Sequence, residues 1–172
     1  METYRLICHP DTPAKAVTGV RVEWIGPGVL RWVVEGAGAL VVPARADRAE
    51  RTDGLWQTTC CEMFLKGGEG YREINLSPSG NWAAYGFDGY RSGMAPALLA
   101  APVIDAVPGE TFTLTAHLSP DVAQGATHAG LTAVIEEEGG HKSYWALAHG
   151  PGKPDFHSPS CFILPLGAAQ HP

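Results

Sequence analysis

Hydrophobic and polar residues alternate with a period of two along much of the chain. The alternation is clearest in residues 111–119 (TFTLTAHLS), and it recurs in residues 17–25 and 29–35, which are joined by Gly-Pro-Gly. Because successive side chains of a strand point to opposite faces, this period predicts half-buried β-strands. The turn between the last two segments predicts an antiparallel hairpin.

The same reasoning predicts further short strands and no helix of normal length. These strands are expected at residues 4–8, 39–43, 60–66, 71–76, 81–87, 131–138, 142–149 and 161–166. The 21 Gly and 14 Pro supply the turns, and residues 94–103 are interpreted as an irregular crossover. We therefore predict one all-β domain over residues 1–172, an antiparallel β-sandwich of about nine or ten strands, with a barrel as the alternative.

A pair of carboxylates stands out in the predicted hairpin of residues 60–66 and 71–76, which flank a Gly-Gly-Glu-Gly turn. If the aliphatic residues of both strands face the core, then Glu62, Glu73 and Asn75 share the opposite face. A carboxylate within an apolar strand must find water, a cation or hydrogen-bond donors. The shared face is either a ligand site or an ordinary solvated sheet surface.

Aromatic residues near these carboxylates favour a ligand site. They are Phe64, Tyr71, Trp82 and Tyr85. Rings stack on the apolar face of a pyranose, while Glu and Asn hold its hydroxyls through hydrogen bonds. This composition predicts a face that binds a sugar or another polyol. Arg91 is expected at its rim, with an ion pair to Glu62 or Glu73 as the alternative.

The two carboxylates also fit a second chemistry, because glycosidases use a pair of Asp or Glu residues as acid and base. Neighbouring strands allow the spacings of both retaining and inverting enzymes. Nothing in the sequence drives the pKa values of Glu62 and Glu73 apart, so hydrolysis is the less favoured hypothesis.

A third group of chemistry-bearing residues follows in the segment YWALAHGPGKPDFH, residues 144–157. Trp145, His149, Asp155 and His157 are expected to form the opposite wall of the site. Asp155 and His157 either tie this loop to the sheet or, with His149, bind a metal, although the spacing matches no metal motif. The remaining histidines are predicted to lie at the surface; they include His9, His117, His128, His141 and His171.

Composition narrows the classes of partner. A net charge of -6 opposes nucleic acids and anionic membranes, and no apolar run reaches the roughly 20 residues of a membrane span. The N-terminus lacks the pattern of a signal peptide, so we expect a cytoplasmic protein. The four cysteines show no paired spacing, which predicts buried free thiols.

With these residues laid out, residues 53–65 (DGLWQTTCCEMFL) and 71–87 (YREINLSPSGNWAAYGF) resemble the DOMON-like group of β-sandwich domains, related to the family 9 carbohydrate-binding module. The match comprises Trp56, Glu62 six positions later, and an Asn-x-Ser-Pro-x-Gly turn that begins at Asn75. Residues 144–157 also resemble bacterial stand-alone members of the group.

The resemblance implies an immunoglobulin-like sandwich in which Trp56 and Glu62 contact sugar, with Trp145 as the nearest candidate for a second aromatic clamp. Other DOMON domains hold haem b between a Met and a His or Lys. Met63 faces away from Glu62 by parity, so Met94 with His157 is the candidate pair here. The polar face argues against a deep apolar haem slot.

Together these inferences predict a non-enzymatic module for a small-molecule ligand, most simply a carbohydrate, with no catalytic residue, metal or resident cofactor. The predicted ligand-binding residues are Trp56, Glu62, Tyr71, Glu73, Asn75, Trp82, Tyr85, Arg91, Trp145, His149, Asp155 and His157.

Overall fold

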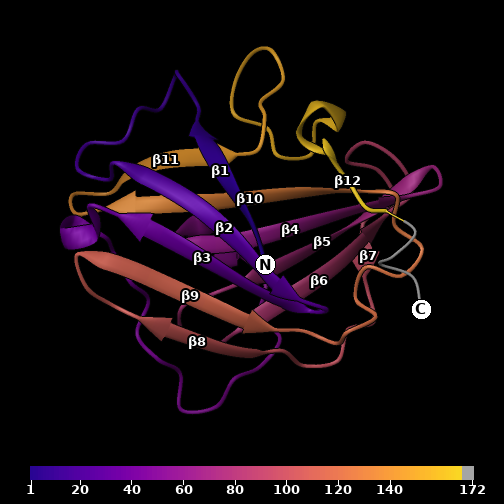
Figure 1. Ribbon diagram of the computed structural model, residues 1–172, viewed down its shortest axis with the longest axis horizontal. Helices are drawn as coiled ribbons and strands as arrows, with labels where there is room; N and C mark the ends of the chain where they lie inside the picture. The colour runs from indigo at the N-terminus through magenta and orange to yellow at the C-terminus, as the bar shows by residue number, and fades with distance from the viewer. Residues whose placement is uncertain (168–172) are drawn as a thin grey trace.

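The computed structural model describes residues 1–167 as an all-β protein (Figure 1). Its three helices are single 3-10 turns, η1 (Ala37–Ala39), η2 (Leu55–Gln57) and η3 (Pro159–Cys161). In the described part of the chain, no helix is long and apolar enough to cross a membrane. The strands are β1 (Glu2–Cys8), β2 (Gly19–Gly26), β3 (Val29–Glu35), β4 (Cys60–Gly67), β5 (Gly70–Leu76), β6 (Trp82–Phe87), β7 (Ala95–Pro96), β8 (Val103–Val107), β9 (Thr111–His117), β10 (His128–Glu137), β11 (His141–Ala146) and β12 (Leu164–Pro165).

All strand pairs are antiparallel, and they form one continuous sheet in the order β7-β6-β5-β4-β10-β11-β1-β2-β3-β9-β8, with β12 beside β10. Strand β1 joins the two halves, because its first residues pair with β2 and its last two pair with β11. The sheet curls into a half-barrel (Figure 1). The predicted all-β class is confirmed. The antiparallel strands form one sheet curled into a half-barrel, and the predicted sandwich is not confirmed.

The strand list differs from the prediction at three places. Residues 39–43 do not form a strand; η1 ends there and Leu40 makes only an isolated bridge to Glu137. The closing run at 161–166 shrinks to the two residues of β12. Residues 94–103 include the two-residue strand β7, and β8 begins at Val103. Within residues 1–167 the total is therefore twelve strands, of which β7 and β12 are only two residues long.

The main core lies between the two halves of the curled sheet. Trp32 on β3 is fully buried there, and its indole Nε1–H donates to the carbonyl of Thr132 on β10 at 3.0 Å. Phe112 and Leu114 of β9 pack into the same cluster as Met63 and Leu131 of the other half. A buried indole needs a hydrogen-bond acceptor, so this contact fixes how the halves approach each other.

Strands β4 and β5 are buried on both faces. Met63, Leu65, Ile74 and Leu76 join the main core, as the alternation predicted. On the other face, Phe64 and Tyr71 form a second apolar cluster with residues of the segment 150–162, which we call the tail segment. Phe64 and Phe162 stack with their ring centroids 5.5 Å apart. The tail segment therefore acts as a second cover over this part of the sheet.

Two predictions about single residues have different outcomes. The four cysteines are free, and Cys60, Cys61 and Cys161 are buried while Cys8 is half-buried, which agrees with the sequence. The surface position predicted for His9 is wrong. Its side chain is buried beside His149, with the ring centroids 4.8 Å apart. His117 is exposed, His128 and His141 are partly exposed, and His171 lies outside the described residues.

Glu137, at the end of β10, anchors the long loop between β1 and β2. Its buried carboxylate accepts the backbone N–H groups of Lys15 at 2.8 Å, Ala16 at 2.5 Å and Val17 at 3.1 Å. Burial would raise the pKa of this carboxyl, but the three donors outweigh it and hold the pKa below its ordinary value.

We expect Glu137→Gln to destabilise the fold by about 1–3 kcal/mol, since the amide cannot accept from three donors. A depressed folded-state pKa gives stability that is complete above the unfolded pKa and is lost as pH falls through the folded one. Urea unfolding at neutral and acidic pH should thus show a difference between wild type and variant that shrinks in acid. Exposed Glu138→Gln is the matched control. An unchanged midpoint for Glu137→Gln at neutral pH would contradict this role.

Candidate functional site

A cavity of about 380 Å³ lies between the tail segment and the face of β4 and β5 that points away from the main core. This size falls in the usual range of small-ligand pockets, about 300–1,000 Å³. Six of the predicted site residues line it: Trp56, Glu62, Glu73, Arg91, Asp155 and His157. We call this cavity the carboxyl pocket.

The two carboxyl groups of the pocket come from paired strands. Glu62 on β4 lies directly opposite Asn75 on β5, and Glu73 lies opposite Phe64. Glu62 and Glu73 are thus diagonal neighbours on one face. They are 3% and 5% exposed, respectively, which is rare for carboxyl groups without a cation in contact. Thr132 Oγ1 donates to Glu62 Oε2 at 3.4 Å.

Burial controls the protonation of this pair. It raises the pKa of Glu62 well above its usual range, and the nearby charge of Glu73 raises it further. Burial also raises the pKa of Glu73, although the Asn75 amide and the positive charge of Arg91 oppose that rise. The pair therefore retains a proton at a pH where an exposed carboxyl has lost it.

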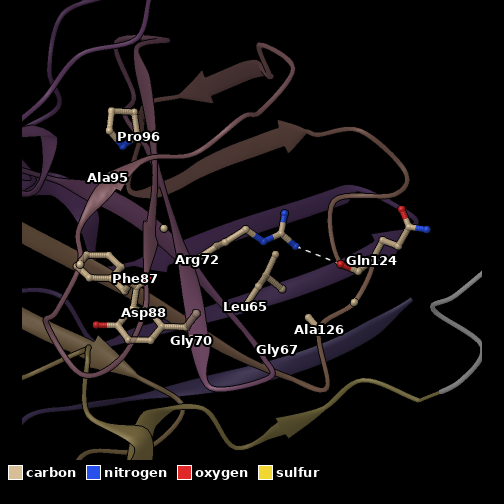
Figure 2. Close-up of a pocket in the computed structure, with 14 residues that line it drawn as sticks. Leu65, Gly67, Gly70, Arg72, Phe87, Asp88, Ala95, Pro96, Gln124 and Ala126 are labelled. Atoms are coloured by element: carbon tan, nitrogen blue, oxygen red, sulfur yellow. Dashed lines mark hydrogen bonds between the residues drawn. The ribbon is translucent and has the colours of Figure 1, made fainter.

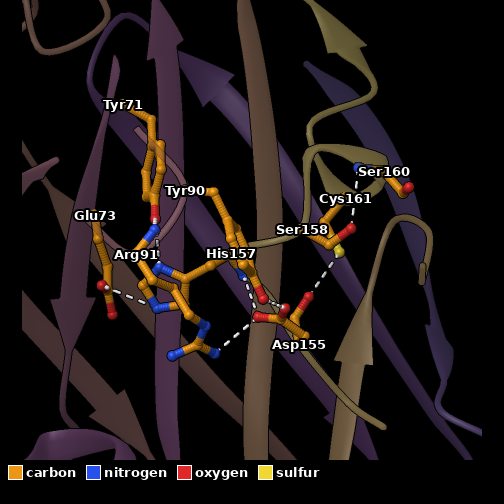
Figure 3. Close-up of polar contacts among 9 residues, drawn as sticks. All are labelled: Tyr71, Glu73, Tyr90, Arg91, Asp155, His157, Ser158, Ser160 and Cys161. Carbon is orange, nitrogen blue, oxygen red and sulfur yellow. Dashed lines mark hydrogen bonds and ion pairs between the residues drawn. The ribbon is translucent and has the colours of Figure 1, made fainter. Parts of the chain in front are cut away.

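A chain of hydrogen bonds connects the sheet to the tail segment (Figure 3). The backbone N–H of Arg91 donates to the Tyr71 hydroxyl at 3.1 Å, and this hydroxyl lies 2.8 Å from His157 Nδ1. The hydroxyl can accept from Arg91 and still donate, so with the ring proton on Nε2, which faces the Glu73 carboxyl, Tyr71 donates to Nδ1. His157 Nε2 lies 3.5 Å from Glu73 Oε2. His157 thus points a donor at Glu73.

The imidazole of His157 stays neutral. Burial, with a smaller contribution from the Arg91 charge, lowers its pKa to about 4. The neutral ring packs against Phe64, at 5.3 Å between centroids, and against Phe87 at 5.1 Å. It does not supply a positive charge to the pocket near neutral pH.

The cation of the pocket is already paired. Arg91 Nη2 lies 2.7 Å from Asp155 Oδ1, and Tyr90 donates its hydroxyl proton to the other oxygen of the same carboxylate (Figure 3). Arg91 also has a φ of 49°, a left-handed conformation that non-glycine residues adopt infrequently. The alternative pairing of Arg91 with Glu62 or Glu73 is not formed. The ion pair instead joins the loop after β6 to the tail segment.

Asn75 lies across from Glu62 on β5 and is completely buried, and it does not line the cavity. Its amide is near enough to Glu73 to lower that carboxyl's pKa. However, neither Nδ2 nor Oδ1 has a hydrogen-bond partner of normal geometry among residues 1–167. A buried amide without partners costs about 1–3 kcal/mol, and such groups call for an explanation.

Trp56 stands at the mouth of the pocket on η2 and is 40% exposed. Its ring makes an edge contact with Tyr85, with 6.4 Å between centroids, and the Tyr85 hydroxyl donates to Asp53. Tyr85 is therefore a support for Trp56 and does not itself line the cavity. Tyr71 likewise supports His157 from below.

Three of the predicted site residues lie elsewhere. Trp82 and Trp145 face the main core. The guanidinium of Arg51 lies over the Trp82 ring, 4.6 Å from its centroid. The indole N–H of Trp145 donates to Ser143 Oγ at 2.9 Å. His149 bonds to the carbonyl of Ile7 at 2.7 Å, away from the pocket. Strict alternation explains the position of both tryptophans. Trp82 is three residues from Tyr85, and Trp145 is next to Tyr144, so each lies on the opposite face of the sheet from that tyrosine.

Sequence reasoning missed three aromatic residues that line the pocket, Phe87, Tyr144 and Phe156. Tyr144 could have been found, because alternation along β11 places it on the face opposite to Trp145. Phe156 lies in the tail segment, which has no periodicity, so no local signal places it. The second aromatic wall of the site is therefore Tyr144 with Phe156, in place of Trp145.

The haem and metal hypotheses do not fit these contacts. Met94 and His157 both line the pocket, but one His157 nitrogen accepts from Tyr71 and the other points at Glu73, so neither is available as an axial ligand. Buried carboxyl groups also make the cavity unlike an apolar haem slot. In the part of the chain described, no three His, Cys, Asp or Glu side chains come close enough to hold a metal ion.

A second cavity, of about 410 Å³, lies at the end of the same hairpin (Figure 2). Arg72 crosses it, but its guanidinium is engaged by the carbonyls of Val122 at 2.8 Å and Gln124 at 3.4 Å. The glycines of its lining, such as Gly67 and Gly70, contribute backbone only. Its only lining carboxyl group among the described residues is the exposed Asp88, so the carboxyl pocket, with its buried pair, is the stronger candidate site.

Comparisons with known proteins support the fold. No protein-family model matches the chain, and no curated protein matches its sequence significantly. In structure, the chain is similar to a candidate carbohydrate-binding protein from Bacteroides uniformis, with a TM-score of 0.57 at 16% identity. The match covers 94% of this chain and 84% of the other. A likeness at this identity establishes a shared all-β fold, and what the relative binds is a property of that protein.

Proposed function

We propose that the chain is a non-enzymatic binding module that holds a sugar or another polyol in the carboxyl pocket. The observation that carries the proposal is the lining of this cavity, where two hydrogen-bonding carboxyl groups face aromatic rings. Trp56 offers a partly exposed ring face to a pyranose, and Glu62 and Glu73 offer paired contacts to its hydroxyls. The structural relative described as a candidate carbohydrate-binding protein adds support.

We further propose that the whole chain is one DOMON-like domain related to the family 9 carbohydrate-binding module. The resemblance rests on Trp56, Glu62 and the turn after Asn75, and Trp56 and Glu62 line the same cavity. The Ser77 hydroxyl of that turn accepts from the backbone N–H of Ser79 at 3.1 Å. This contact gives the turn residues a structural role beside the site.

Titration with mono- and disaccharides should quench or shift tryptophan fluorescence at millimolar ligand. Trp56 dominates this signal because the other four tryptophans are buried. Trp56→Ala should weaken affinity roughly 2- to 10-fold, as loss of one stacking face costs about 0.5–1.5 kcal/mol. Calorimetry measures this variant, because it lacks Trp56, the tryptophan that reports on the ligand. The neighbouring exposed Gln57→Ala is the control, and a panel without any binder would refute the proposal.

A specific observation favours a second candidate function, acid–base hydrolysis of a glycosidic bond. Glu62 and Glu73 are diagonal neighbours on one face of the pocket, and burial raises the pKa of both, as a carboxyl that acts as a general acid requires. In this scheme Glu62 is the acid and Glu73, beside the His157 donor, is the base or nucleophile.

If hydrolysis occurs, Glu62→Gln should reduce the turnover of an aryl glycoside by at least about 100-fold, because the amide cannot donate a proton as a general acid. Release of the chromogenic aglycone over a range of pH measures this. The surface variant Glu69→Gln, on the turn of the same hairpin, should leave turnover unchanged. Wild type that binds the sugar without any turnover assigns the protein to the binding class.

A further inference from the structure

We propose that the preferred ligand of the carboxyl pocket carries a protonated amine, so that its class is an amino sugar or amino polyol, with the ammonium group seated between Glu62 and Glu73. This inference rests on the proposed function, because it names the chemistry of the ligand for the same site. It follows from four features of the pocket: charge balance, hydrogen-bond donors, aromatic lining and the unpartnered Asn75.

Charge balance is the first feature. Glu62, Glu73 and Asp155 line the pocket, and Arg91 is the permanent cation among its described lining residues. Arg91 lies 2.7 Å from Asp155, which leaves the other two carboxyl groups without a cation in contact. Two buried carboxyl groups side by side ionise together only when a positive charge joins them. A ligand ammonium supplies that charge.

The second feature is the shortage of donors. Glu62 has one hydrogen bond, from Thr132 at 3.4 Å. Glu73 has the distant contact from His157 at 3.5 Å and the nearby Asn75 amide, which makes no hydrogen bond of normal geometry. A pair of carboxylates has about eight lone-pair sites in total, so most acceptor capacity is open to the cavity. An ammonium group carries three donors and no acceptor, which complements this arrangement.

Aromatic rings form the third feature. Trp56, Tyr144 and Phe156 line the pocket from three different elements. The faces of such rings attract cations, and carboxylates combined with rings are the usual environment of bound ammonium groups. Neutral sugars also stack on rings, so the rings alone do not discriminate. Together with the unpaired carboxyl groups they favour the cation.

Asn75 provides an observation independent of the acidic residues. It is completely buried on the same strand face, directly across from Glu62, and its amide has no normal hydrogen bond within residues 1–167. Asn75 does not line the cavity itself, so its amide lies behind the carboxyl pair. A buried amide without a normal hydrogen bond beside Glu62 and Glu73 adds to the unsatisfied polar groups at this face.

The proposal predicts that ligand binding is coupled to proton release. Without ligand, Glu62 and Glu73 share one proton. When one ligand ammonium group enters, this proton leaves the pair for solvent, so the charge of the site stays constant. Other groups near the pair do not offer a competing proton at neutral pH. These neighbours are Cys60, Tyr71 and Tyr85, whose pKa values are raised, and His157, Arg91 and Asp155, whose charge states are fixed.

The experiment compares neutral ligands with their amino-deoxy counterparts by calorimetry. Suitable pairs are glucose with 6-amino-6-deoxyglucose, galactose with 6-amino-6-deoxygalactose, and sorbitol with 1-amino-1-deoxysorbitol. We expect one amino member to bind at least roughly tenfold more tightly than its neutral partner, because charge-assisted hydrogen bonds replace neutral ones. Its affinity should rise with pH for as long as the empty pair still holds its proton, with a limiting slope of roughly tenfold per pH unit, while the neutral partner shows no such slope.

Proton release is measured on the wild type, by repeating the titration in buffers of different ionisation enthalpy. We expect about one proton per bound ligand. Glu62→Gln should remove both the proton release and the preference for the amine over its neutral partner. Glu69→Gln, which alters an exposed glutamate of the same hairpin, should match wild type in every titration.

The outcomes separate this inference from the proposed function. Equal or tighter binding of the neutral member, without proton exchange, overturns the ammonium site and leaves the sugar module standing. Tight binding of a simple alkylamine, such as butylamine, to the same degree as the amino sugar supports the ammonium site and refutes sugar recognition. Failure of all pairs to bind overturns both.

Discussion

The structure depends on the fact that strands β4 and β5 are covered on both faces. The main core covers one face, and the tail segment covers the other through Phe156 and Phe162. An ordinary curled sheet would leave its outer face in water, where carboxylates cost nothing. Here the second cover removes Glu62 and Glu73 from water, and their raised pKa values follow from that burial.

The tail segment is held in place by polar contacts, and these contacts also shape the site. The hydrogen bond from Tyr71 to His157 and the ion pair of Arg91 with Asp155 connect three separate parts of the chain. Since Arg91 is more than half exposed, its ion pair contributes little stability. Its main effect is on charge: it engages Arg91, the permanent cation among the described lining residues, and leaves the carboxyl pair without a cation in contact. Binding chemistry and loop anchoring are thus parts of one network.

The carboxyl pair also explains why the residues that line the pocket do not by themselves distinguish a binding site from a catalytic site. Two buried carboxyl groups with raised pKa values suit a glycosidase, a sugar clamp and an ammonium site alike. The differences lie in what enters the pocket. Neutral His157, engaged Arg91 and the unpartnered Asn75 all favour a donor-rich, positively charged guest over an anionic one.

The sequence by itself determined the β class, most of the hairpins and the face that carries Glu62, Glu73 and Asn75, because period-two alternation needs only neighbours along the strand. The same rule assigned Met63 and Leu65 to the core, and applied strictly it also separates Tyr85 from Trp82 and Tyr144 from Trp145. Tertiary structure alone decided that one curled sheet forms, that the tail segment lies over the carboxyl pair, and that Arg91 pairs with Asp155. These contacts join residues more than 60 positions apart through loops without periodicity, so no local pattern encodes them.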